Sequence, residues 1–179
     1  MTSVSHTHNE WGKSLDQVPP DDHRELLHEL AHSIHPAFSD LWYKWTPLHM
    51  REGFVEVIAR ILGKTQSELR DSKEYIKKRL PSELVDPLTL DAEGLFARSK
   101  QPLSINPAYL STTAYVAGLS SLLGNRNISH GLHILKSVAE KEQDTDNFMA
   151  HLSNKVNGKL HDPVWRRNIQ IDGIQRLVE

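Results

Sequence analysis

Two histidines and a glutamate stand close together near the start of the chain, in the stretch His28-Glu29-Leu30-Ala31-His32. If residues 22–35 form a helix, as the spacing of their apolar residues indicates, His28 and His32 lie one turn apart on the same face. Two imidazoles in that geometry can bind one metal ion, and the adjacent carboxylate of Glu29 can act as general base toward a water that the metal activates. The stretch therefore predicts a metal site with hydrolytic chemistry.

A second helix, expected over residues 47–63, offers two carboxylates one turn apart, Glu52 and Glu56. A zinc ion with two histidine ligands takes a third protein ligand and keeps one position for water or substrate. We expect Glu52 to be that ligand and Glu56 to accept the outer N–H of a ligating imidazole. A shift of the helix by one turn would exchange these roles. Alternatively, the two glutamates are surface charges or ion-pair partners of Arg51 or Arg60.

Length and composition limit the classes of protein to consider. The 179 residues, 38% of them hydrophobic, are enough for one domain with a core and too few for two. The chain has no cysteine, so imidazole and carboxylate groups must hold any metal, which suits a catalytic zinc site. The net charge of -2, with both signs interspersed, predicts no nucleic-acid partner. Without a membrane-length apolar stretch or a signal peptide, we expect no membrane partner and a cytoplasmic location.

Strong helix start and stop signals divide the chain, and alternating β-branched runs are almost absent. We expect a flexible tail over residues 1–20 and a single α-helical domain over residues 21–179. Beyond the two helices of the metal site, helices are expected at about 65–80, in two short pieces within 82–99, and at about 109–123, 129–142, 145–156 and 162–179. The predicted fold class is a compact, mostly α multi-helix domain with little or no β-sheet.

These segments resemble those of a known family. His28-Glu29-Leu30-Ala31-His32, followed by Arg51-Glu52-Gly53-Phe54, is similar to the H-E-x-x-H and x-E-G-F arrangement of gluzincin zinc metallopeptidases of the aminopeptidase N and leukotriene A4 hydrolase type. Tyr115-Val116-Ala117-Gly118 is similar to the Tyr-x-x-Gly helix that carries the family's oxyanion-stabilising tyrosine. The resemblance runs in order from about residue 28 to residue 160, and it implies a helical catalytic subdomain of zincin type.

Carried over by position, the resemblance implies a Zn2+ ion held by His28, His32 and Glu52. It implies that Glu29 is the general base and proton shuttle of peptide-bond hydrolysis. Tyr115 would stabilise the oxyanion through its hydroxyl, with Tyr109 as the alternative donor. The implied substrate is a peptide or protein.

The family normally has a β-sheet before the metal helix, and the edge of that sheet holds the substrate backbone. The 27 residues before His28 include no predicted strand, so we expect a second copy of the chain or a partner chain to supply this surface. Two other classes stay open. One is a noncatalytic helical binding or assembly module that keeps the gluzincin scaffold. The other is a helical bundle with a di-iron centre, based on the cluster His23, His28, His32 and His35.

Overall fold

The computed structural model describes residues 26–32, 46–62, 68–91, 94–95, 106–142 and 144–179. Within these ranges the regular secondary structure is helical and includes no strand, which confirms the mostly α fold class. The tail expected over residues 1–20 lies outside the described residues. None of the helices in the described ranges is both long enough and apolar enough to cross a membrane.

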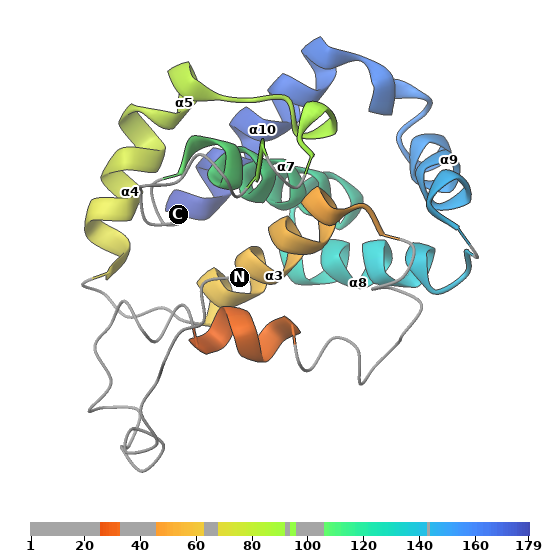
Figure 1. Ribbon diagram of the computed structural model, residues 1–179, viewed down its shortest axis with the longest axis horizontal. Helices are drawn as coiled ribbons and strands as arrows, with labels where there is room; N and C mark the ends of the chain where they lie inside the picture. Colours follow the sequence, from red (N-terminus) through yellow and green to blue (C-terminus); the bar gives the residue numbers. More distant parts are fainter. Residues whose placement is uncertain (1–25, 33–45, 63–67, 92–93, 96–105, 143) are drawn as a thin grey trace.

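Helix follows helix along the described ranges of the chain (Figure 1). A helical segment at residues 26–32 comes first and lies beside α3 in the figure. The labelled elements are α3 (Leu48–Leu62), α4 (Glu68–Lys78), α5 (Leu80–Glu83), η2 (Pro87–Thr89), α7 (Pro107–Leu123), α8 (Ile128–Ala139), α9 (Thr145–Lys155), η4 (Lys159–His161) and α10 (Pro163–Val178).

The longer expected helices are confirmed where the structure describes them. The five predicted over residues 47–63, 65–80, 129–142, 145–156 and 162–179 correspond to α3, α4, α8, α9 and α10, with ends that differ by no more than three residues. The two short pieces expected within 82–99 are only partly described: α5 begins at Leu80, before that range, and η2 lies inside it. Local start and stop signals therefore fixed most helix limits.

The central helix of the fold is α7, and α3, α8 and α10 pack around it (Figure 1). Every residue from Tyr109 to Ser121 is buried. The side chain of Asn106 accepts hydrogen bonds from the backbone N–H groups of Ala108 and Tyr109, with Pro107 in the first turn. This cap starts α7 two residues before the expected position.

Glycine lets two neighbouring helices approach α7 closely. A Cβ atom on Gly53 of α3 would lie 2.8 Å from the carbonyl oxygen of Thr112, and one on Gly118 would lie 1.9 Å from that of Ile169 in α10. Any larger residue would force the helices apart at these crossings. The Gly53 crossing holds the part of α3 that carries Glu52 directly against α7.

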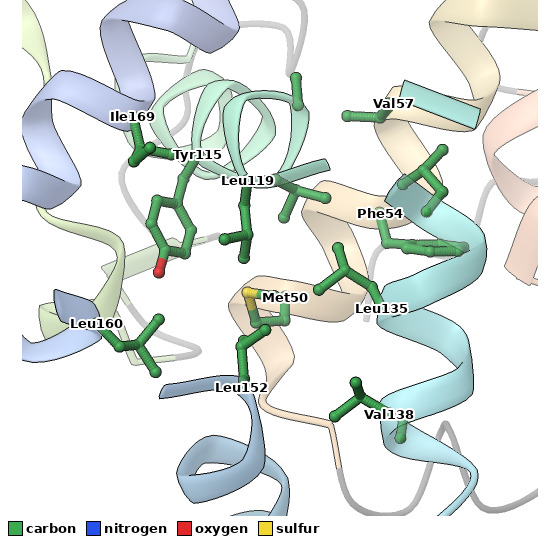
Figure 2. Close-up of a cluster of buried hydrophobic side chains, with 14 of the residues drawn as sticks. Met50, Phe54, Val57, Tyr115, Leu119, Leu135, Val138, Leu152, Leu160 and Ile169 are labelled. Carbon is green, nitrogen blue, oxygen red and sulfur yellow. The ribbon is translucent and has the colours of Figure 1, made fainter. Parts of the chain in front are cut away.

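The apolar side chains of these helices meet in one main core (Figure 2). Met50 and Phe54 of α3 pack there with Tyr115 and Leu119 of α7 and with Leu135 of α8. The core therefore joins the helix that carries the two glutamates to the central helix and its neighbours.

An ion pair ties α10 to the segment before η2. Arg166 donates a hydrogen bond from Nε to Oδ1 of Asp86 at 2.9 Å, and a second from Nη2 to Oδ2. Its Nη1 donates to the carbonyl oxygen of Leu160 at 2.9 Å, and Asp86 also accepts from the backbone N–H of Leu88 at 3.1 Å. Three oxygen atoms, two of Asp86 and one of Leu160, thus accept hydrogen bonds from the buried guanidinium.

Candidate metal centre

The two histidines and Glu52 come together in the folded chain. His28 and His32 lie one turn apart in the helical segment 26–32, and Glu52 faces them from α3. The Nε2 atoms of the two histidines are 2.9 Å apart. Oε2 of Glu52 lies 3.5 Å from Nε2 of His28 and 3.4 Å from Nε2 of His32. Among the described residues, the side chains that converge closely enough to hold a metal ion are those of His28, His32 and Glu52.

Two of the three distances among these atoms match the spacing of zinc ligands. Atoms bound at 2.0–2.1 Å to a tetrahedral zinc are about 3.3–3.4 Å apart. The two distances from Glu52 are 3.5 and 3.4 Å, close to that value, and the distance between the histidine nitrogens, 2.9 Å, is shorter. Two imidazoles and one carboxylate also form a donor set typical of catalytic zinc, which leaves the fourth position for water or substrate.

Burial and charge make the cluster attractive to a cation. Burial alone would lower the pKa of His28, but hydrogen bonds with Glu52 and Glu56 outweigh it and raise the pKa to about 9. Burial alone would raise the pKa of Glu52, but hydrogen bonds with His28 and His32 lower it to about 2. The carboxylate therefore stays ionised next to the two imidazoles, and the cluster favours a bound positive charge.

Glu56 lies behind His28, on the side away from Glu52. Its Oε2 atom is 3.2 Å from Nδ1 of His28, and its Oε1 atom accepts a hydrogen bond of 2.8 Å from Nε of Arg60. Both glutamates are buried, Glu56 completely. Glu52 thus faces both Nε2 atoms and Glu56 faces the outer nitrogen of one ring, which is the first of the two arrangements expected from the sequence. The alternative pairing with Arg60 is also present, through the other oxygen of Glu56.

Glu29 projects differently from its histidine neighbours. It is exposed, whereas His28 is buried and His32 half-buried. The half-buried face of His32 and the exposed Glu29 lie on adjoining positions of the same short helix. Its exposure leaves this carboxylate accessible to water.

The structure places the two candidate tyrosines in different surroundings. The hydroxyl of Tyr109 lies 3.1 Å from Nδ1 and 3.3 Å from Nε2 of His28, so it is in contact with the cluster. Tyr115 lies in the main core, where its ring points toward Leu160 (Figure 2). Its hydroxyl is buried and has no hydrogen-bond partner among the described residues. The structure therefore brings Tyr109, the alternative donor, to the cluster and does not bring Tyr115 there.

The spacing along α7 explains this difference. Tyr115 is six positions after Tyr109, which is about 9 Å along the helix axis. Around the axis the two side chains point about 120° apart. The contact between Tyr109 and His28 joins residues 81 positions apart. The motif Tyr-x-x-Gly could not reveal this contact, because it depends on how the helical segment 26–32 packs on α7.

Two predicted features lie partly outside the described residues. His23 and His35, which belong to the cluster considered for a di-iron centre, are not described. The expected partner surface stays a prediction. On the described segment, Leu26 and Leu30 lie one turn apart and are 42% and 47% exposed.

Comparison of the chain with family models, curated proteins and solved structures finds no match. The resemblance to gluzincins therefore depends on the motif residues alone.

Proposed function

We propose that this protein is a zinc-dependent hydrolase of gluzincin type that cleaves peptide bonds. One observation carries the proposal: Nε2 of His28, Nε2 of His32 and Oε2 of Glu52 converge, and both distances from Glu52 suit two ligands of a tetrahedral zinc. The H-E-x-x-H order supports a hydrolytic site, since it supplies a base next to the two imidazoles.

Each residue of the cluster has a distinct part in this proposal. When bound, zinc would supply a Lewis acid that activates water and polarises a carbonyl group. His28, His32 and Glu52 hold it. Oε2 of Glu56 accepts a hydrogen bond from the Nδ1–H group of His28, which leaves Nε2 of the same ring as the ligand atom.

Glu29 takes the proton of the attacking water and passes it to the leaving amine. Its exposed position lets water and substrate reach it. Tyr109 stands in place of Tyr115 as the phenolic donor, because its hydroxyl contacts His28. The motif resemblance favours a peptide as the substrate, and a second copy or partner chain remains the expected source of the substrate-binding strand.

The donor count favours a mononuclear site over the di-iron alternative. Two imidazoles and one carboxylate converge within 4.8 Å of one another among the described residues. A di-iron centre of the bundle type uses four carboxylates and two histidines from four helices. The noncatalytic alternative predicts no hydrolysis of any peptide, with or without zinc.

The first experiment is the metal content of protein purified without a histidine tag, by elemental analysis after zinc loading and dialysis. We expect close to one zinc per chain, and loss of that zinc in His28→Ala. The control is His130→Ala, which removes an exposed histidine outside the cluster. Zinc at the same level in His28→Ala, or no zinc in the unmodified protein, would rule out the proposed site. Bound zinc without cleavage of a peptide library would favour the noncatalytic alternative.

A further inference from the structure

A pocket lies between the C-terminal ends of α3 and α10 and the turn that joins α7 to α8. Its volume is about 450 Å³. Four cationic side chains line it: Arg60, Lys73, Arg126 and Arg176. Glu179 is the acidic residue among its lining side chains. The lining is therefore strongly basic, although the whole chain has a net charge of -2.

Two of the four cations already have acidic partners. Arg60 donates to Glu56 at 2.8 Å, and Arg176 donates to the carboxylate of Glu179 at 3.0 and 3.3 Å. Lys73 and Arg126 form no ion pair with any residue in the described part of the chain. In addition, Nε of Arg176 is buried and has no hydrogen-bond partner there. The pocket thus holds uncompensated positive charge and an unused buried donor.

The backbone adds to this field. Ile128 and Ser129, in the first turn of α8, also line the pocket. The Asn127 side chain accepts the N–H of His130, and the N–H groups of the residues before it have no partner within the helix. The N-terminal end of a helix carries a partial positive charge that favours anions. The N-terminal end of α8 therefore acts in the same direction as the basic side chains, whereas the C-terminal ends of α3 and α10 carry the opposite partial charge.

We infer that this pocket binds a small polyanion that carries phosphate or carboxylate groups. Guanidinium groups offer paired donors that fit the oxygens of either group, and at least two negative charges are needed to match Lys73 and Arg126. The volume lies in the range of pockets for small molecules. Arg60 bonds Glu56 behind His28, so the pocket adjoins the histidine cluster, but His28, His32 and Glu52 do not line it. The anion site therefore uses other residues than the proposed metal site, and the inference does not depend on the proposed hydrolase function.

The test uses metal-free protein, dialysed free of chelator, and isothermal titration calorimetry at low ionic strength. Inorganic pyrophosphate and citrate are the two probes, titrated separately. We expect one of them to bind with one site per chain, and the tighter one to identify the phosphate or carboxylate class. Because the assay contains no metal, its failure would say nothing against the zinc site.

The variant Lys73→Gln/Arg126→Gln should weaken that binding about tenfold or more. Lys73 and Arg126 are substituted and Arg60 is kept, because Arg60 also bonds Glu56 and its removal would disturb the histidine cluster. The control Lys141→Gln/Lys159→Gln removes the same charge from two exposed sites outside the pocket and should change the affinity less than twofold. Arg126→Gln alone, at an exposed side chain, serves as the second variant if the double substitution fails to fold. No binding of either probe at millimolar concentration, or equal weakening by pocket and control variants, would overturn the inference.

Discussion

Nδ1 of His28 lies 3.2 Å from Oε2 of Glu56, a residue 28 positions away on α3. If Nε2 of this ring binds zinc, Nδ1 carries the proton and donates a hydrogen bond to Oε2 of Glu56. Such a partner orients the ring and increases its basicity. We therefore expect Glu56→Gln to weaken zinc binding about 10- to 100-fold, measured by competition with a chromophoric chelator.

The matched control for this measurement is Glu140→Gln, which removes a carboxylate from an ion pair with Lys136 outside the cluster. It should leave the affinity for zinc unchanged. Equal affinities in the unmodified protein and Glu56→Gln would mean that Glu56 serves only as the partner of Arg60.

Glu29 is expected to act on the water and not on the metal. Glu29→Gln keeps the size of the side chain but removes its ability to accept a proton. Zinc content should therefore stay near one per chain, while turnover of a cleaved peptide should fall by about 100-fold or more. Full activity in this variant, with zinc still bound, would exclude Glu29 as the general base.

The convergence of His28, His32 and Glu52 could be predicted from the sequence because its parts are local. A helix places His28 and His32 on one face by itself, and a second helix does the same for Glu52 and Glu56. The order of helices could also be predicted, since a cap such as Asp162 uses a side chain next to the helix that it starts. The Asn106 cap was missed, and α7 therefore begins two residues before the expected position. The histidine pair and the glutamate pair were assigned to one site because an H-E-x-x-H pattern is followed by a later glutamate.

Other contacts between distant segments could not be predicted from the sequence. The hydroxyl of Tyr109 meets His28 only because the segment 26–32 and α3 both pack near the start of α7. The close crossing of α3 and α7 at Gly53 contributes to that packing. Neither a motif nor a periodicity encodes which of two tyrosines in the buried stretch of α7 faces the histidine cluster.

The two tyrosines give opposite expectations when the hydroxyl is removed. Tyr109→Phe deletes a group in contact with His28, so turnover should fall about tenfold or more while zinc stays bound. Tyr115→Phe deletes a buried hydroxyl without a partner among the described residues, so turnover should not change. Its free energy of unfolding should rise by about 1 kcal/mol, because an unpaired buried polar group is costly. Chemical denaturation and a peptide-cleavage assay of both variants provide the test.

Loss of turnover in Tyr115→Phe with normal activity in Tyr109→Phe would restore the assignment that the motif implies. It would also require Tyr115 to leave the core during the reaction.

The ion pair between Asp86 and Arg166 should make stability depend on pH in the acidic range. Burial alone would raise the pKa of Asp86, but the hydrogen bonds from Arg166 and from the Leu88 backbone outweigh it and lower the pKa below its usual value. The folded chain therefore binds this proton less readily than the unfolded chain. The contribution of the pair is complete above the ordinary aspartate pKa of about 3.9, and it is lost as the pH falls through the lower folded pKa.

Asp86→Asn should accordingly lower the free energy of unfolding by about 2 kcal/mol at pH 6. The difference from the unmodified protein should shrink at pH 3 and below, where the carboxylate of the unmodified protein also begins to take up a proton. Urea denaturation monitored by circular dichroism at both pH values measures this change. Asp146→Asn, at an exposed position on α9, is the control and should have a small effect at both pH values. A difference between Asp86→Asn and the unmodified protein that stays constant from pH 6 down to pH 2 would show that the substitution acts through packing and not through the charge of Asp86.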